Sequence, residues 1–292
     1  MIGRIGIMST GLFFGLTTVD LFNVVPRHPL PNQKIKTEHQ AISAGGPAAN
    51  AAVTFKAFGN NARLCSGLGT HPVAALAAID LHEHHVTLID ATLDPEDLPV
   101  LSSILIDSST GDRCVVYSDP GRKRLHGEID YHNLLNGCEV VLFDGFYLDQ
   151  ALVAARTARD RGITTVLDGG SWKKGLENLL PFIDYAVCSS DFYPPGCSTT
   201  EEVFSYLNDT GAAHCAISRG RDTMVALVDG APTDIPVPEV KAVDTLGAGD
   251  ILHGAFCHFI VTHPFVQSLR MSAETASHSC RYHGTREWIH HL

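Results

Sequence analysis

Short apolar runs alternate along the chain with longer stretches in which apolar residues recur every three or four positions. Runs bounded by glycine or polar residues are typical of buried strands, and the longer periodic stretches are typical of amphipathic helices. The alternation predicts an α/β fold, with βα units around a mostly parallel sheet that helices cover on both faces. The expected strands are RIGIM (4–8), ARLCSGLG (62–69), VVLFDG (140–145), ITTVLDGG (163–170), DYAVCSS (184–190), AHCAIS (213–218) and MVALVDG (224–230). The expected helices cover 47–59, 71–85, 149–161, 200–210 and about 249–262.

Two segments depart from this rhythm. Residues 11–43 contain no helical pattern, and residues 101–126 predict a β-hairpin that turns at SSTGD. We expect parts of both segments to form a small β-sheet that acts as a lid on the main domain. No repeat or linker divides the chain, so residues 1–292 are expected to form a single domain with a helical C-terminal part.

The composition is that of an ordinary globular protein, with 45% hydrophobic and 18% charged residues and a mean hydropathy of +0.07. The formal net charge of −11 argues against binding to nucleic acid or to a membrane surface, because both rely on basic patches. No apolar run approaches the roughly 20 residues of a membrane span, and the start lacks the features of a signal peptide. We therefore expect a cytoplasmic protein. The eight cysteines include no C-x-x-C pair, so reduced, structural thiols are expected.

The stretch VDTLGAGDILHGAF (243–256) carries the strongest chemical signal. Gly247, Ala248 and Gly249 precede an apolar helical run, so several amides of the first turn lack intrahelical partners. Small side chains let a phosphate approach the backbone there, and the helix dipole favours its negative charge. Asp250 would repel that phosphate unless it had a task, such as taking the proton from an attacking hydroxyl. The alternative is that Asp250 only begins the helix.

A second glycine-rich helix start favours the catalytic interpretation. In SAGGPAANAAVTFKAFG (43–59), Gly45 and Gly46 precede an alanine-rich helix. Asn50 lies in its first turns and is a side chain suited to sugar hydroxyls.

These two stretches resemble the two signatures of the ribokinase-like (PfkB) family of carbohydrate kinases. The first is the glycine-glycine-to-asparagine segment, here Gly45–Gly46 and Asn50, and the second is the D-T-x-G-A-G-D pattern, here 244–250. The likeness extends over essentially the whole chain. It implies a kinase that uses ATP and Mg²⁺, with Asp250 as the base for a sugar hydroxyl and the amides of 247–250 as the anion hole.

The resemblance implies further binding residues. Asp20, in TTVDLF, matches an early sugar-binding aspartate of the family, so the small-molecule sugar is expected to contact Asp20, Gly45, Gly46 and Asn50. In ISRGRD (217–222), Ser218 and Gly220 match positions near the nucleotide phosphates and ribose. The terminal helix around 276–284 would form a wall of the adenine pocket. The full set of expected nucleotide-binding residues is Asp191, Ser218, Gly220, Thr245, Ala276, Cys280 and Gly284.

One motif of the family is missing. Many members carry N-x-x-E near the metal and the nucleotide, whereas the corresponding segment here is CSSDFYP (188–194). Asp191 could replace the acid, but no asparagine is present, so the metal ligands stay unassigned. A similar loss occurs in the ketohexokinase-like branch, which GGPAANAAV, VLDGGSW and DTLGAGDILHGA also resemble. The resemblance to this branch implies a ketose as the substrate.

Four further features have a functional and a structural interpretation. Arg113, in the hairpin, could reach over the site and bind an anionic group, or it could be a strand-edge arginine. His253 could tune Asp250 or touch substrate, or simply pack. Asp168 could order the site through water or a metal, or cap the following turn. The cluster HEHH (82–85) has no H-E-x-x-H spacing and is expected to be a solvated helix end.

Three questions stay open at this point. A nucleoside kinase of the same fold would share these signatures, and so would a sugar- or nucleotide-binding regulator without catalysis. An open edge of the lid sheet would favour a homodimer. The sequence does not decide whether a monovalent cation activates the site.

Overall fold

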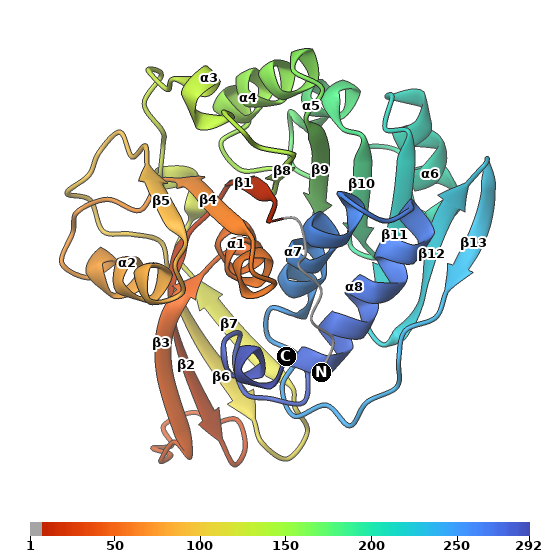
Figure 1. The fold of residues 1–292 in the computed structure, drawn as a ribbon. Coiled ribbons are helices and arrows are strands. Elements are labelled where there is room, and N and C mark those ends of the chain that lie inside the picture. Colours follow the sequence, from red (N-terminus) through yellow and green to blue (C-terminus); the bar gives the residue numbers. More distant parts are fainter. Residues whose placement is uncertain (1–7) are drawn as a thin grey trace.

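The structure, a computed structural model, describes residues 8–292 and contains two β-sheets (Figure 1). The strands of the larger sheet are β1 (Thr10–Phe14), β4 (Asn61–Ser66), β5 (Thr87–Asp90), β8 (Val140–Phe143), β9 (Thr164–Gly169), β10 (Tyr185–Ser189), β11 (His214–Arg219), β12 (Asp222–Val228) and β13 (Ala231–Ile235). They lie in the order β13-β12-β11-β10-β9-β8-β1-β4-β5. Neighbouring strands from β11 to β5 are parallel, and only β12 and β13 join antiparallel. The predicted mostly parallel sheet is confirmed.

Helices cover both faces of this sheet, as predicted. On one face lie α1 (Pro47–Ala57), α2 (Ala74–Glu83), α7 (Ala248–Ile260) and α8 (Phe265–Ser279). On the other face lie α3 (Tyr131–Leu134), α4 (Leu148–Asp160), α5 (Leu176–Leu179) and α6 (Thr200–Asp209). Short 3₁₀ turns are present at η1 (Pro120–Arg122), η2 (Leu180–Phe182) and η3 (Glu287–His291). The expected helices are all present, with ends shifted by a few residues.

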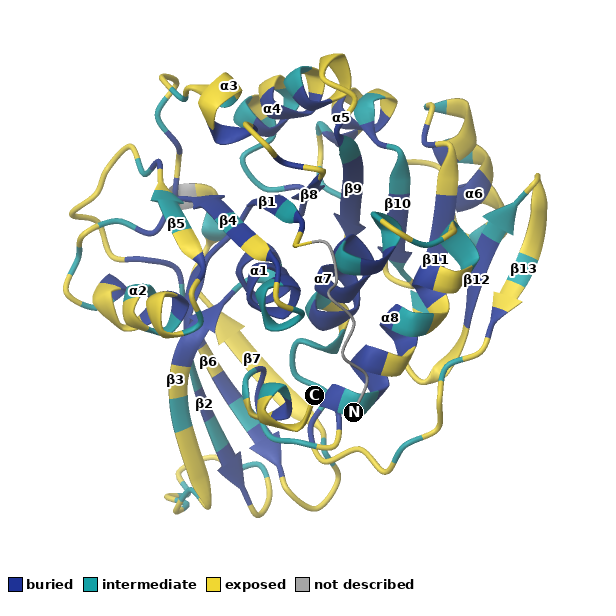
Figure 2. Cartoon of the chain, in the orientation of Figure 1, coloured by how far each residue is buried: buried dark blue, intermediate teal, exposed yellow. Residues whose placement is uncertain are grey.

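Alternating side chains of the strands explain why the sheet needs two helical layers. In β1, Phe13 packs into the core cluster beneath α1 and α7, while Leu12 and Phe14 pack into the cluster beneath α3 and α4. Both clusters are fully buried at these positions, which Figure 2 shows as dark blue central strands. A strand buried on both faces reads as a continuous apolar run, because neither set of alternating side chains meets water.

The smaller sheet projects from one end of the main body (Figure 1). It has the order β3-β2-β6-β7, with β2 (Thr18–Val25), β3 (His39–Gly45), β6 (Leu101–Asp107) and β7 (Arg113–Tyr117). The pairs β2–β3 and β6–β7 are antiparallel and β2–β6 is parallel. Parts of the segments 11–43 and 101–126 thus form one small sheet, as predicted, while residues 11–14 belong to β1 of the large sheet. The use of the small sheet as a lid stays a prediction.

The predicted strands differ from the observed ones at three places. The strand expected at 4–8 lies, apart from Met8, outside the described residues, and the first described strand is β1. The edge strands β5 and β13 were not predicted, because half-exposed edges lack the continuous apolar runs of the central strands. In the described part of the chain, no helix is long and apolar enough to cross a membrane.

Candidate functional site

Hydrogen bonds to the segment that follows α8 fix the loop before α7. One carboxylate oxygen of Asp244 accepts hydrogen bonds from the amide of Leu246 and the other from the amide of Gly284, both at 2.8 Å. The amide of Val243 donates to the carbonyl of Cys280 at 2.7 Å. Gly247 then turns the chain into the helix with a φ of 67°, a left-handed conformation that favours glycine. The glycine-rich loop is therefore fixed before the helix begins.

The first amides of α7 face open space. Between residues 8 and 292, no acceptor bonds the amides of Gly249 and Asp250, while the amide of Ala248 makes a long 3.3 Å bond to Thr245. A Cβ added to Gly249 would meet no atom within 4 Å. Free amides at a helix start, together with the helix dipole, attract an anion. This end of α7 can therefore bind a phosphate group.

The start of α1 has the same glycine-rich sequence character but is filled. Gly46 has a φ of 92° and leads into the helix. The carboxylate of Asp144 accepts hydrogen bonds from the amides of Leu16, at 2.7 Å, and Ala48, at 3.3 Å. Burial raises the pKa of Asp144 to about 6, while Lys173 and the backbone amides act in the opposite direction. An internal carboxylate thus takes the place that an external anion would need.

Asp250 lies in the first turn of α7 with its carboxylate turned toward other acids. Burial raises the pKa of Asp250 to about 7, and the nearby charges of Asp168 and Asp20 add to this rise. A hydrogen bond of 2.7 Å from the side-chain amide of Asn50 lowers the pKa, and so does His253. A carboxyl group with a pKa near neutrality can exchange a proton with a hydroxyl group at physiological pH.

Asn50 is oriented by an arginine near the end of the chain. Arg286 donates to the side-chain oxygen of Asn50 at 2.9 Å, so the nitrogen of that amide points to Asp250. Arg286 is itself held by Asp80 of α2, which it contacts at 2.9 Å. Asn50, on α1, is 4% exposed and lies between two charged groups.

Asp20, on β2 of the small sheet, also faces the site. Its carboxylate accepts a hydrogen bond from the hydroxyl of Thr18 at 2.5 Å. Burial raises the pKa of Asp20, and hydrogen bonds from Thr18 and Ser102 and the charge of Arg286 lower it. A side chain on Gly45 would overlap this carboxylate, so glycine there allows the close approach. The structure thus brings Asp20, Asn50 and Asp250 close enough for Asp20 and Asn50 to act on the pKa of Asp250, while their roles in binding and catalysis stay predictions.

Asp168 and His253 form a buried pair beneath Asp250. The Nδ1 atom of His253 lies 3.3 Å from a carboxylate oxygen of Asp168 and 2.7 Å from the carbonyl of Gly249. Its Nε2 atom lies 2.8 Å from the carbonyl of Val187. Both ring nitrogens of His253 are thus occupied by contacts within the protein, so His253 is a packed residue that lies beneath the site.

Arg113 connects the small sheet to the loop before α7. It lies on the exposed strand β7 and donates to the hydroxyl of Thr245 at 2.7 Å. The hairpin tip also comes close to the loop, since a Cβ on Gly111 would lie 3.9 Å from the carbonyl of Val243. The hairpin therefore lies against the loop that forms the anion site.

The expected nucleotide-binding residues occupy several elements. Ser218 ends β11, and Gly220 forms the turn into β12 with a φ of 62°. Asp191 is exposed in the segment after β10, while Ala276 and Cys280 are buried on α8 and at its end. Gly284 follows Cys280 by four residues; its amide donates to Asp244 at 2.8 Å, and a Cβ there would meet the ring of Phe22 in the small sheet. The structure thus places Gly284 beside the small sheet.

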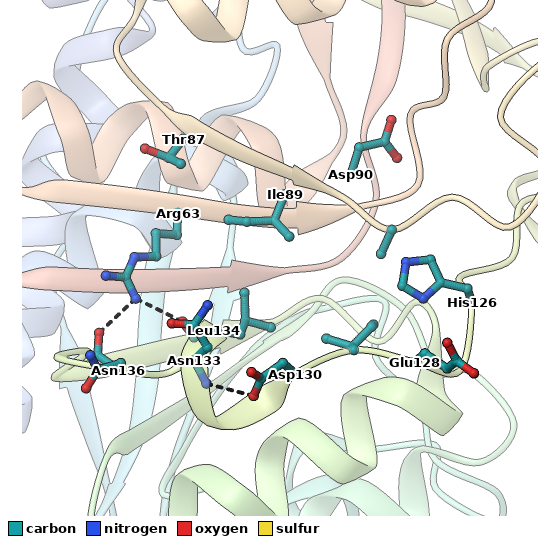
Figure 3. A pocket seen from close by; sticks show the side chains of 12 residues that line it. Arg63, Thr87, Ile89, Asp90, His126, Glu128, Asp130, Asn133, Leu134 and Asn136 are labelled. Atoms are coloured by element: carbon teal, nitrogen blue, oxygen red, sulfur yellow. Dashed lines mark hydrogen bonds between the residues drawn. The ribbon is translucent and has the colours of Figure 1, made fainter.

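A separate pocket of about 390 Å³ lies at the edge of the large sheet, between β4, β5 and the segment before and within α3 (Figure 3). Arg63 and Asn133 line it, and both make hydrogen bonds within the protein. None of the candidate site residues lines this pocket. No group of three His, Cys, Asp or Glu side chains in the described residues is arranged to hold a metal ion. The HEHH segment accordingly forms the end of α2.

Three residues that interact with the site were not predicted from the sequence. Arg286 and Asp80 orient Asn50, but no local motif marks either of them. Asp144 follows β8 in LFDG, and a polar residue at the end of a parallel strand is a weak sign of a site. Each of these side chains reaches the site through contacts between distant parts of the chain.

Comparison with known proteins agrees with this geometry. Residues 8–291 match the pfkB family of carbohydrate kinases. The chain is 24% identical over 258 residues to the fructosamine kinase FrlD of Bacillus subtilis strain 168, which covers 85% of this chain and 87% of that protein.

Solved structures share the same fold. A protein of Agrobacterium tumefaciens described as a ribokinase superposes with a TM-score of 0.84 and 24% identity, covering 97% of this chain and 98% of that one. The ribokinase of Arabidopsis thaliana, solved with ribose and ATP, gives a TM-score of 0.74 at 18% identity, covering 95% and 94% of the two chains. The ribokinase-like fold predicted from the two glycine-rich stretches is confirmed. The chain therefore belongs to the pfkB family of carbohydrate kinases and is an ATP-dependent carbohydrate kinase.

Proposed function

We propose that this kinase transfers the γ-phosphate of ATP to a hydroxyl group of a ketose or a ketose derivative, with Asp250 as the base. One observation carries the proposal. The carboxylate of Asp250 stands beside two amides at the start of α7 that no acceptor in residues 8–292 bonds, and its pKa is raised to about 7. The amides suit the transferring phosphate and the carboxylate suits the attacking hydroxyl.

In the proposed reaction, the substrate hydroxyl gives its proton to a carboxylate oxygen of Asp250 as the hydroxyl oxygen attacks the γ-phosphorus. The bond from that phosphorus to the bridging oxygen of ADP breaks, and ADP leaves. The amides of Gly247, Ala248, Gly249 and Asp250 stabilise the charge on the transferring group. Mg²⁺ would arrive with the phosphates of ATP and neutralise part of their charge, and phosphate oxygens and water supply most of its ligands. The described residues offer no cage of three metal-ligating side chains, so we derive no step through this ion.

The sugar would lie between the small sheet and the start of α7. Asp20 on β2 and the free N–H of the Asn50 amide offer an acceptor and a donor for hydroxyl groups. Gly45 and Gly46 shape this site indirectly, because Gly45 makes room for the carboxylate of Asp20 and Gly46 for the backbone of Leu16. The small sheet would act as a lid that excludes water, which otherwise competes with the sugar for the phosphate. The bond from Arg113 to Thr245 supports this role, because it joins the sheet to the anion loop.

The nucleotide would extend from the start of α7 toward β11 and α8. Ser218 and Gly220 lie at the end of β11, and Ala276 and Cys280 belong to the helix beside it. Asp191 and Thr245 complete the proposed set, and Gly284 contributes through its bond to Asp244. A monovalent cation stays a further proposal for the same region.

The relative FrlD suggests which class of sugar accepts the phosphate. That protein is named a fructosamine kinase, and fructosamines are ketose derivatives. We therefore place fructosamines beside free ketoses as the first acceptors to test. Asp20 and Asp250 face the site, and the nearby Arg286 is already paired with Asp80, which favours a neutral or cationic acceptor over a phosphorylated one.

The test is ADP release from Mg·ATP with a panel of ketoses, fructosamines, aldoses, sugar phosphates and nucleosides. Turnover with ketoses or fructosamines supports the proposal. Preferred turnover of nucleosides would identify a nucleoside kinase instead. Thermal stabilisation by a sugar without any turnover would indicate a regulator that only binds.

The small sheet also supports a homodimer. All five residues of its edge strand β7 are exposed, with Val116 at 72% and Tyr117 at 64%. An exposed apolar edge strand is covered most simply by a second copy of the same edge. We also place the enzyme in the cytoplasm, a proposal that the eight free cysteines support.

A further inference from the structure

The guanidinium group of Arg286 donates all its hydrogen bonds to groups within the protein. Its Nε atom and one terminal nitrogen bond Asp80, at 3.2 and 2.9 Å, and the same terminal nitrogen bonds the carbonyl of Ala44 at 2.7 Å. The other terminal nitrogen bonds the side-chain oxygens of Asn50 and Thr285, both at 2.9 Å. That nitrogen makes a further, longer contact of 3.4 Å to the carbonyl of Thr285. A guanidinium group has five N–H donors, and these six contacts occupy all of them. Arg286 therefore has no donor left for a substrate.

The contacts of Arg286 also decide which way the Asn50 amide points. Arginine only donates hydrogen bonds, so the atom of Asn50 that it contacts must be the oxygen. The nitrogen of Asn50 then faces Asp250 at 2.7 Å. In the flipped orientation two donors would face each other at Arg286, and two acceptors would face each other at Asp250. The flipped amide is excluded as long as Arg286 stays in place.

Asp80 joins Arg286 to the end of β3, just before α1. Its carboxylate accepts from Arg286 and from the amide of Ala44, the residue before the double glycine. The two side chains are only 14% and 13% exposed, so water weakens the ion pair little. Downstream, the fully buried Trp288 anchors the same segment through a bond to the carbonyl of Thr285. Arg286 is thus fixed from both sides.

We infer that Arg286, held by Asp80, is a positioning residue that fixes the Asn50 amide so that it donates to the carboxylate of Asp250. The inference rests on the proposed role of Asp250 as the base. A donor at this place favours the ionised carboxylate, which is the form that accepts the substrate proton. Arg286 acts through Asn50 and does not touch the reacting atoms.

The first test is a double-mutant cycle. Arg286→Lys keeps the positive charge beside Asp80 but loses the fork that reaches Asn50. We expect kcat to fall about tenfold, the loss of one charge-assisted hydrogen bond, with the KM for ATP unchanged. In an Asn50→Ala background, Arg286→Lys should have no further effect, because its path to Asp250 is already broken. Arg270→Lys, on the exposed side of α8, is the matched control and should match the parent enzyme.

The second test does not need turnover. Carboxyl ¹³C NMR would follow the titration of Asp250 in the free protein, with the signal assigned by its loss in Asp250→Asn. We expect a midpoint near pH 7 in the parent protein. Without the Asn50 donor the pKa of Asp250 rises, so the midpoint should move up by about one pH unit in Arg286→Lys and in Asn50→Ala.

Several results would overturn the inference. Additive losses in the cycle would mean that Arg286 does not act through Asn50. An unchanged midpoint in Arg286→Lys would mean that the amide stays in place without it. If Arg286→Lys does not fold, Asp80→Asn tests the same idea, since it only loosens Arg286 and should shift the midpoint in the same direction by less. If the parent protein turns over no acceptor, the proposed function fails while the NMR titration still decides this inference.

Discussion

The two glycine-rich helix starts of this kinase look alike in sequence and differ in what fills them. At α1 the carboxylate of Asp144 bonds the amides of Leu16 and Ala48, so an acceptor from within the protein already lies at the helix start. At α7 the amides of Gly249 and Asp250 have no partner in residues 8–292. The difference teaches that a glycine-rich helix start is only a potential anion site. Whether it binds a ligand depends on whether another part of the chain has already supplied an acceptor.

The acids at the two starts also have different roles. Asp144 is 1% exposed and accepts three backbone hydrogen bonds, from Leu16, Ala48 and Phe146. Asp250 accepts one hydrogen bond, from Asn50. Burial raises the pKa of both, to about 6 for Asp144 and about 7 for Asp250. An acid with three fixed donors holds structure, whereas an acid with one donor and a raised pKa can exchange a proton.

The sharpest way to test this comparison is Asp250→Asn. We expect ADP release to fall by about 10³-fold, the scale of a lost general base. The same change should raise the melting temperature at pH 8. A carboxyl group whose folded pKa is raised to about 7 stabilises the fold only at low pH, and this contribution is lost as the pH rises through 7. The neutral amide avoids that loss, so the gain in melting temperature should vanish near pH 4.

An activity near that of the parent enzyme would contradict the assignment of the base. A melting temperature that falls at pH 8 would contradict the buried, raised-pKa carboxyl group. The two readouts are independent, because one follows turnover and the other follows thermal unfolding.

Asp144→Ala should destabilise the protein, in contrast to Asp250→Asn. It leaves three backbone amides without their acceptor, so we expect the free energy of unfolding to fall by about 2–4 kcal/mol. Asp144→Asn keeps one acceptor oxygen and should lose less. Denaturant unfolding followed by circular dichroism measures both. An unchanged midpoint in Asp144→Ala would mean that the start of α1 is open, as at α7, and that the comparison fails.

The smallest changes in stability and turnover are expected for alanine substitutions at Gly249 and Gly247, which should differ in sign. Gly249→Ala adds a methyl group in open space and improves helix propensity, so stability should rise by about 0.5–1 kcal/mol. The methyl group stands where the phosphate would approach, so turnover should fall several-fold. Gly247→Ala is the matched control, because its φ of 67° and its contact with Thr285 should make it destabilising. If Gly249→Ala is stable and fully active, the phosphate does not approach the backbone at Gly249.

Much of the fold could be predicted from the chain. The central strands are buried on both faces, so their apolar runs are continuous and easy to find, as in VVLFDG. The edge strands β5 and β13 were not predicted, because they are short and most of their residues are exposed or only partly buried, so they form no continuous apolar run. The hairpin at 101–126 was found through its turn residues, but its neighbours β2 and β3 were expected only as part of a helix-free segment.

In the candidate site, too, residues that are near in sequence could be related to one another, and residues that meet only in the fold could not. The carboxylate and the glycines of 247–250 lie within four positions, so their relation is visible in the sequence. Gly284 was expected beside the nucleotide, which stays a prediction, and its contacts with Asp244 and Phe22 join distant parts of the chain. His253 could not be placed by its position in the helix alone, since its partners Gly249 and Val187 come from two different elements.

By itself, the sequence determined the layered α/β fold, the glycine-rich turn into α7 and the carboxylate that follows it, because periodicity and helix-start chemistry depend on neighbours a few residues apart. Tertiary structure alone decided which helix start stays open and which way Asn50 points. Asp144 meets Ala48 across 96 positions, and Arg286 meets Asn50 across 236. Such contacts depend on how the strands and helices pack in space, and no local pattern of residue types encodes them.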